Sequence, residues 1–211
     1  MTAIDRTQLA AMGEKALEAM GQEEITALAD RGYYKGEEVL ALEGTGVLPC
    51  VPKTQTSNNP DRGLFSGDDF VYDAKADHYT CPAGERLTKG AVRSDRRDNM
   101  DQYRNLTACL TCALKPQCTA DRVKRVKRWQ HEGVLDKMQA RLDRMPEAMT
   151  IRRQTVEHTF GTLKAWMGAT HFLTKTLKNV RTEMSLQVLA YNMKRMINRF
   201  GVKPLIGAIA A

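Results

Sequence analysis

The first part of the chain repeats apolar residues with the period of an α-helix. One face of this stretch carries four apolar side chains: Leu9, Met12, Ala16 and Met20. The spacing predicts an amphipathic helix over residues 5–20, and Asp5 is suited to cap its N-terminus. The apolar run Ile25–Ala29 predicts a buried strand, and Val47–Val51, interrupted by Pro49, predicts a second strand at an edge or terminus, with a short helix over residues 36–42 between them. This order of elements predicts part of an α/β fold with a parallel strand pair.

The rest of the chain changes character twice. Polar residues at 52–69 predict a loop, and aromatic residues at 70–72 and 78–79 predict a small hairpin. From residue 122 onward the pattern predicts only helices, expected over residues 122–145, around Glu157 and over residues 181–200, with a loose tail at the C-terminus. We therefore expect an α/β (overall α+β) chain of three parts: residues 1–60 with the parallel pair, a Cys-rich segment over 61–121, and a basic helical region over 122–211.

Charge is distributed unevenly along the 211 residues, whose formal net charge is +7. Residues 1–120 hold 14 basic and 18 acidic residues, whereas residues 121–211 hold 18 basic and 7 acidic residues. A basic C-terminal half suits the phosphate backbone of a nucleic acid, although a basic helical region that binds nothing has the same composition. No apolar run approaches the roughly 18 residues of a membrane span, and the N-terminal residues lack the pattern of a secretory signal, so a cytoplasmic location is expected.

Two carboxylates are the first candidates for chemistry. Asp30 directly follows the first predicted strand, where α/β folds place reactive groups, although the same residue could simply cap the next helix. Arg153 and Lys164 share one face of the predicted helix with Glu157. Such a face suits a metal-binding carboxylate beside cations that bind a polyanion. The alternative is an ordinary ion pair on a solvent-exposed helix, which has the same spacing. A neighbouring apolar stripe is expected to be buried: Val156, Phe160, Leu163 and Met167.

Four of the five cysteines form a second candidate site. Cys109, Cys112 and Cys118 have the spacing C-x2-C-x5-C, and Cys81 lies 28 residues upstream of the first of them. Four thiolates with one close pair fit a tetrahedral structural Zn²⁺ ion, and structural disulfides are rare in the cytoplasm. A set of buried or free thiols is the alternative. The remaining Cys50 is expected to be a packing residue in its strand.

Five segments, in this order, resemble the C-terminal part of bacterial insertion-sequence transposases with a DDE catalytic domain: ALADRGYYKGEEV, YDAKADHYTCPAGERL, CLTCALKPQCT, RRQTVEHTFGTLKAWMG and VLAYNMKRM. The resemblance implies an RNase H-like α/β core in which two Asp and one Glu bind two divalent ions, usually Mg²⁺ (or Mn²⁺). Asp30 corresponds to the second Asp of that family. Glu157 corresponds to its Glu, within the R-x3-E-x6-K pattern that includes Arg153 and Lys164. The Cys-rich segment resembles the insertion between these two carboxylates.

The resemblance also implies that the partner is DNA, as transposon ends and target. It places Arg153 and Lys164 against phosphates near the cleavage point, and a basic track is expected to extend this contact: Arg152, Lys124, Arg125, Lys127 and Arg128. DNA binding would bring the chain to the bacterial nucleoid.

Two positions depart from the family pattern. Thr150 stands where related transposases have Tyr, three residues before the Arg. The first catalytic Asp is expected upstream, on the first strand of the sheet, and Asp5 is a poor substitute for it. We therefore expect a C-terminal segment of a transposase, produced by truncation, a frameshift or an internal start, which alone neither cuts nor joins DNA. The alternatives are a DNA-binding or regulatory fragment that associates with itself or with the full-length enzyme, and a zinc-stabilised module with no role on DNA.

Overall fold

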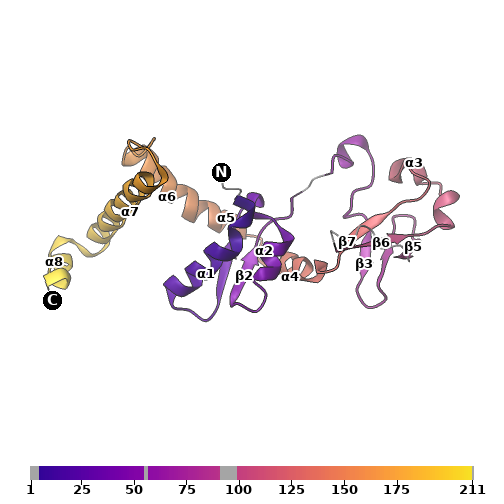
Figure 1. Ribbon diagram of the computed structural model, residues 1–211, viewed down its shortest axis with the longest axis horizontal. Coiled ribbons are helices and arrows are strands. Elements are labelled where there is room, and N and C mark those ends of the chain that lie inside the picture. Colours follow the sequence, from indigo (N-terminus) through magenta and orange to yellow (C-terminus); the bar gives the residue numbers. More distant parts are fainter. Residues whose placement is uncertain (1–4, 55–56, 91–98, 211) are drawn as a thin grey trace. The chain divides into compact units, whose positions relative to one another are not determined.

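The computed structural model describes residues 5–54, 57–90 and 99–210 of the chain (Figure 1). The chain forms two compact units, Met1–Pro146 and Glu147–Ala211. The first unit mixes helices with two sheets, whereas the described residues of the second unit form helices without strands. This mixture of helix and strand confirms the expected α+β class.

The first unit begins with a parallel strand pair covered by helices. The elements are α1 (Leu9–Met20), β1 (Ile25–Leu28), α2 (Gly36–Ala41) and β2 (Val47–Cys50). The strands pair in parallel, with Ile25 opposite Val47 and Leu28 opposite Cys50, as the sequence predicted. α4 (Glu132–Asp143) packs against α2 and β2. The buried core of this part consists of Leu9, Val39, Leu42, Val47, Val51, Leu135 and Met138.

The helix predicted over residues 5–20 begins later and buries a different face. Asp5 lies in a 3-10 turn, so the N-cap of α1 is Gln8 and the predicted cap is wrong. Met20 was expected on the buried face and is 62% exposed, whereas Gly13 is buried. A Cβ on Gly13 would lie 3.0 Å from Cγ1 of Val47. The helix therefore approaches β2 most closely at a residue without a side chain.

Five short strands of the first unit form one antiparallel sheet, with neighbours in chain order: β3 (Val71–Asp73), β4 (His78–Thr80), β5 (Arg86–Lys89), β6 (Met100–Arg104) and β7 (Val126–Trp129). Its core is aromatic, and the hydroxyls of Tyr72 and Tyr103 both donate to the carboxylate of Asp77, at 2.7 and 2.5 Å. These two hydrogen bonds, led by that from Tyr103, lower the pKa of Asp77. The predicted hairpin is confirmed as β3 and β4, but the other three strands were not foreseen.

The helix predicted over residues 122–145 is wrong in its first part. Val126–Trp129 is strand β7, which pairs antiparallel to β6 with Val126 opposite Tyr103, and α4 begins only at Glu132. Pairing with the open edge of β6 supplies backbone hydrogen bonds and half-buries Val126 and Trp129, and this outweighs a local preference for helix. Residues 122–146 consequently belong to the first compact unit.

Alanine at Gly36 is expected to destabilise the first unit by about 1–3 kcal/mol. A Cβ at this position would lie 2.9 Å from Cζ3 of Trp129, so the ring through which β7 contacts α2 would have to move. Urea unfolding of the variant measures the effect. Gly133→Ala is the matched control, because a Cβ at that position in α4 meets no heavy atom within 4 Å. Equal destabilisation by the two variants would contradict the steric explanation.

The second unit is built from helices in its described part. α5 (Ala148–Arg152) and α6 (His158–Gly161) alternate with π-helical stretches, Arg153–Glu157 and Thr162–Trp166, which together form the helix predicted around Glu157. α7 (Leu177–Phe200) begins four residues before the predicted start at 181. α8 (Val202–Ala210) occupies the C-terminal stretch that was predicted to be a loose tail.

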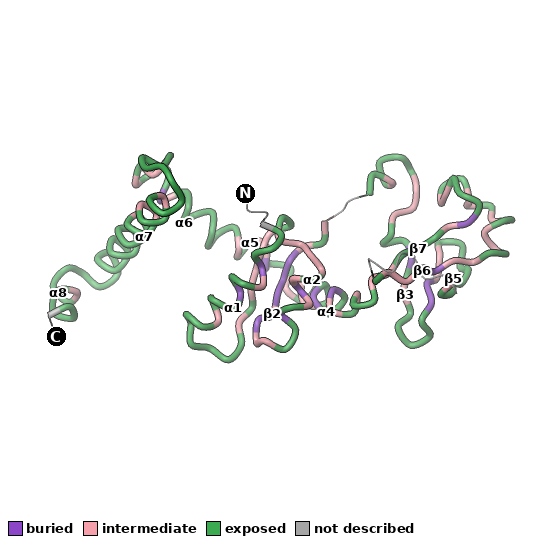
Figure 2. Tube along the Cα trace, viewed as in Figure 1, coloured by how far each residue is buried: buried purple, intermediate pink, exposed green. Residues whose placement is uncertain are grey.

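The apolar positions of the second unit are largely exposed (Figure 2). Leu163 is buried, but Val156 and Phe160 are 37% and 47% exposed, so the predicted buried stripe is wrong at these two positions. A π-helical turn shifts the residues that follow it out of the 3.6-residue register on which the stripe depended. The 24-residue α7 is the longest described helix, and no described helix combines the length and apolar character that a membrane span requires.

Candidate functional site

Asp30 lies where the first parallel strand ends. The backbone N–H of Ala29 still donates to the carbonyl of Cys50, 3.2 Å away, so Asp30 is the first residue beyond the strand pairing. The chain then turns in a 3-10 helix, Arg31–Tyr33, for which Asp30 is the N-cap. Its Oδ1 accepts a hydrogen bond from the backbone N–H of Gly32, at 2.8 Å. Asp30 therefore caps the next turn, as the alternative interpretation expected, and its catalytic role stays a prediction.

Gly32 is fitted to this carboxylate. A Cβ on Gly32 would lie 2.9 Å from Oδ1 of Asp30, which is too close for the carboxylate to stay in place. The absence of a side chain lets the backbone N–H approach the carboxylate and fix its direction. Gly32 therefore helps to position the carboxylate of Asp30. The sequence alone did not assign this role to Gly32.

Glu157 ends the first π-helical stretch of the second unit and is exposed. Its Oε1 lies 3.7 Å from Nη1 of Arg152, whose side chain is only 18% exposed. The two residues are five positions apart, the spacing that a π-helical turn brings together. An α-helical reading placed Arg153, four positions away, beside the carboxylate. The structure instead gives this ion pair to Arg152.

The cations predicted to grip DNA around Glu157 are accessible. Arg153 and Lys164 are both exposed, and neither makes an ion pair with a described residue. Thr150, which stands at the Tyr position of the family pattern, is also exposed. Arg153 and Lys164 are thus exposed cations on the same continuous helical run as Glu157, and exposed positive charges suit a polyanionic ligand.

Asp30 belongs to the first compact unit and Glu157 to the second. Carboxylate oxygens are the ligands that Mg²⁺ prefers, so the donor chemistry of both residues fits such an ion. Within the described ranges, no three His, Cys, Asp or Glu side chains stand in a group arranged to hold a metal ion. The metal roles of Asp30 and Glu157 therefore remain predictions.

The four cysteines singled out from their spacing line one small cavity. This cavity, of about 30 Å³, lies beside the core of the five-stranded sheet. Cys81 follows β4 in a tight turn, where the N–H of Gly84 donates to its carbonyl at 2.8 Å. Cys109 lies in a 3-10 turn (Ala108–Leu110), and Cys118 ends the short helix α3 (Lys115–Cys118). All four are free thiols.

The electrostatics of Cys118 reflect how close these thiols lie to one another. Burial is the main cause that raises the pKa of its thiol, and the other three cysteines raise it further, whereas Lys124 acts in the opposite direction. Lys115 and Lys124 also line the cavity. Four soft donors around one cavity are the ligand type of a thiolate zinc site, but among the described residues no three of them stand in a group arranged to hold an ion. Cys50, by contrast, is fully buried in β2, as expected of a packing residue.

The predicted basic track at residues 124–128 is divided between the interior and the surface. Nζ of Lys124 lies 5.0 Å from the ring centroid of Phe70 and donates to the carbonyl of Cys118. Arg128 stacks over the ring of Tyr72, donates to the hydroxyl of Tyr79 and pairs with Asp136. Arg125 and Lys127 are exposed. Arg125 and Lys127 are thus the members of this track whose charges face solvent without an internal partner.

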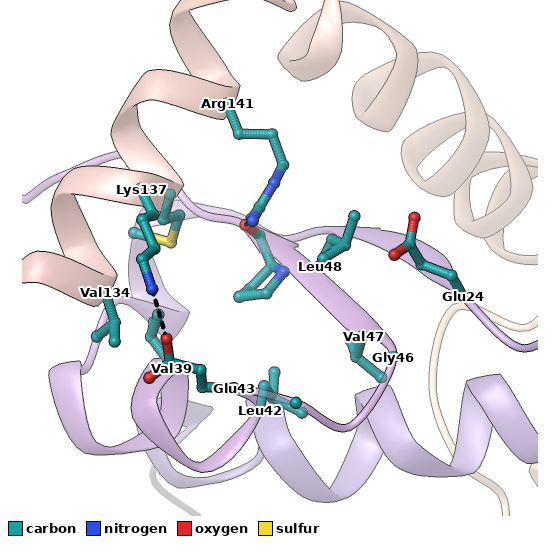
Figure 3. Close-up of a pocket in the computed structure, with 13 residues that line it drawn as sticks. Glu24, Val39, Leu42, Glu43, Gly46, Val47, Leu48, Val134, Lys137 and Arg141 are labelled. Atoms are coloured by element: carbon teal, nitrogen blue, oxygen red, sulfur yellow. Dashed lines mark hydrogen bonds and ion pairs between the residues drawn. The ribbon is translucent and has the colours of Figure 1, made fainter.

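A cavity of about 350 Å³ is lined by residues of β2 and α4 in the first unit (Figure 3). The charged groups on its wall are already paired: Nζ of Lys137 lies 2.7 Å from Oε1 of Glu43, and Arg141 donates to the carbonyl of Pro49 at 2.7 Å. Arg141 thereby covers the outer edge of β2, where the proline itself offers no N–H. These contacts stabilise the edge of β2. The charged groups of Glu43, Lys137 and Arg141 are engaged in them.

Comparison with known proteins bears on these residues. A model of the transposase DDE domain matches residues 80–197, more than half of the chain. The matched residues include the four cavity cysteines and Glu157, whereas Asp30 lies before them. No curated protein and no solved structure matches the chain.

Proposed function

The chain belongs to the transposase DDE domain family, and we propose that it serves the cleavage and transfer of DNA strands in an insertion-sequence element. Family membership by itself gives a function in DNA transposition, a DNA substrate and a dependence on divalent metal ions. The observation that carries the finer proposal is that Glu157, Arg153 and Lys164 are all exposed on one continuous helical run. The parallel pair with its covering helices supports an RNase H-like core in residues 1–60.

Each residue of the proposed site has a separate role. Asp30 and Glu157 would hold Mg²⁺ or Mn²⁺, which supplies charge neutralisation and activation of an oxygen nucleophile when bound. Arg153 and Lys164 bind the phosphates on either side of the scissile bond and offset the charge that develops there. Arg152 positions Glu157 through their ion pair, and Arg125 and Lys127 add phosphate contacts within the first unit.

The alternative is a catalytically inactive DNA-binding or regulatory fragment. The resemblance assigns two of the three carboxylates of a DDE site to this sequence, and two carboxylates hold a divalent ion weakly. Self-association, or association with a full-length transposase, would be the way such a chain acts. In either case we propose that it works in the bacterial cytoplasm and at the nucleoid when DNA is bound.

We expect the purified chain to bind duplex DNA with a steep salt dependence and not to nick supercoiled plasmid in Mg²⁺ or Mn²⁺. Replacing Arg153 and Lys164 by Gln is expected to lower the slope of log affinity against log salt by about two, because each removes one phosphate contact. Fluorescence anisotropy and agarose gels provide the two measurements.

The control for the cleavage assay is Glu147→Gln, another exposed carboxylate of the second unit. Nicking that Glu157→Gln abolishes and Glu147→Gln leaves intact would establish that this chain is active alone. A chain that binds no DNA at any salt concentration would contradict the proposed function itself.

A structural Zn²⁺ ion is the second proposal, and it rests on the cavity shared by Cys81, Cys109, Cys112 and Cys118. A cavity of about 30 Å³ accommodates one ion but not a larger ligand. The sulfurs have to close on the ion, and the release of their protons makes binding weaker at low pH. Because the cavity adjoins the core of the five-stranded sheet, the ion would stabilise that sheet rather than take part in DNA chemistry.

A further inference from the structure

The two faces of the five-stranded sheet differ in how their charges are satisfied. Side chains alternate between faces along each strand, and the strand register fixes which residues share a face. One face carries the aromatic core, and its cations are paired: Lys89 with Asp101 at 2.6 Å, and Arg128 with Asp136. We call the opposite one the outer face. Its strand positions include Thr80, Arg86, Thr88, Gln102, Arg104 and Lys127.

Three cations cross the outer face in a diagonal row. Thr88 lies directly opposite Arg104, so Arg86, two residues along β5, is a diagonal neighbour of Arg104. Gln102 lies opposite Lys127, so Lys127 is a diagonal neighbour of Arg104 on the other side. Diagonal neighbours in an antiparallel sheet are about 7–8 Å apart. Three adjacent strands therefore present a regular line of positive charge.

These cations are available to a ligand. Arg86 and Lys127 are exposed, Arg104 is half-buried, and none of the three makes an ion pair with a described residue. Among the strand positions of this face, Asp73 on the edge strand β3 is the single acidic residue. Its carboxylate is already engaged by the backbone N–H groups of Lys75 and Ala76, at 2.9 and 3.1 Å.

Gly90 gives Arg104 its place in the row. A Cβ on Gly90 would lie 3.2 Å from Nε of Arg104, so the guanidinium rests against a position that has no side chain. The backbone is fixed there as well, because the N–H of Gly90 donates to the carbonyl of Gln102 at 2.8 Å. The arginine is thereby held on the face by the sheet itself, which reduces the entropy lost when it binds a phosphate.

We propose that the outer face of the five-stranded sheet is a binding surface for the backbone of duplex DNA, with Arg86, Arg104 and Lys127 each contacting a phosphate. Thr88 and Gln102 lie between these cations and supply uncharged hydrogen-bonding groups for phosphate oxygens. The surface lies in the first unit and is separate from the face around Glu157 in the second. The inference rests on the proposed DNA function and extends it, since Arg86 and Arg104 had no assigned role.

The test compares two triple variants of the full chain that carry equal charge. R86Q/R104Q/K127Q removes the row, and R6Q/K15Q/R62Q removes three exposed cations elsewhere in the first unit; each lowers the formal net charge from +7 to +4. Binding of a labelled mixed-sequence duplex is followed by fluorescence anisotropy over a range of KCl concentrations. The outer-face variant is expected to bind about tenfold more weakly or worse, with a salt slope lower by about three, whereas the control keeps the wild-type slope.

A charge-retaining variant, R86K/R104K, separates loss of contact from loss of fold, because it is expected to keep the wild-type slope. Thermal unfolding followed by circular dichroism checks all three variants. If the outer-face and control variants weaken binding equally, the outer face is not a binding surface, although the proposed DNA function stands. If the wild-type chain binds no duplex DNA, the proposed function fails and this inference fails with it.

Discussion

Replacement of Gly46 by alanine is expected to destabilise the α/β part of the first unit by about 3 kcal/mol or more. Gly46 has a φ of 85°, and a Cβ there would lie 2.3 Å from the backbone oxygen of Glu23. Its own carbonyl accepts the first hydrogen bond of the parallel pair, from Ile25 at 2.9 Å. Because two backbones meet at this point, neither can move without breaking the pairing that positions Asp30.

The neighbouring Gly44 provides the matched control. Its φ of 82° is nearly the same, but a Cβ at Gly44 meets no heavy atom within 4 Å. Gly44→Ala should therefore cost only the conformational strain, about 1 kcal/mol. Urea unfolding of both variants, followed by circular dichroism, measures the difference. Similar losses of unfolding free energy in the two variants would show that the close approach to Glu23 does not contribute to the destabilisation by Gly46→Ala.

Removal of zinc is expected to have the second large effect. The chain should purify with one zinc ion, and a chelator should lower its stability by about 4 kcal/mol when the free zinc had exceeded the dissociation constant a thousandfold. Cys112→Ala should lose the ion, because it removes one of four thiolates from the shared cavity. Metal analysis and thermal unfolding with and without chelator are the measurements.

Cys50→Ala is the control for the zinc prediction. Cys50 is a fully buried free thiol in β2 and is not among the cysteines that line the cavity. The substitution should cost packing energy and leave the zinc content unchanged. Zinc affinity should also fall as the pH is lowered, because the thiols must lose their protons to bind metal and burial already raises the pKa of Cys118. If the chain purifies without metal and a chelator does not change its stability, the structural zinc ion is excluded.

Local patterns predicted the elements whose sequence agrees with their environment. Ile25–Ala29 and Val47–Val51 are mostly apolar runs, and they form the expected parallel pair. Val126–Trp129 could not be recognised in the same way, since two adjacent basic residues separate its apolar ends and its strand conformation depends on pairing with β6. The pairing strand β6 lies 22 or more residues away in the chain, so it does not affect the local hydrophobic periodicity from which strands are predicted.

The site around Glu157 shows the same limit at the scale of one helical turn. The sequence grouped this carboxylate with Arg153 and Lys164 on one helix face, a grouping that stays a prediction, and it did so with a period of 3.6 residues. The π-helical stretch Arg153–Glu157 changes that period locally, and the ion pair moves from Arg153 to Arg152. Hydrogen bonds from threonine side chains to carbonyls one turn back, such as Thr155 to Ile151 at 2.9 Å, accompany the change.

The sequence by itself determined which chemical groups this protein has: the carboxylates at 30 and 157, the spacing of the four cysteines and the excess of positive charge after residue 120. The tertiary structure decided which of these groups are available. It turned Lys124 and Arg128 toward internal partners, gathered the four thiols on one cavity, and set Arg86, Arg104 and Lys127 in one row. The reason is that availability depends on strand register and burial, which arise only when distant segments pair.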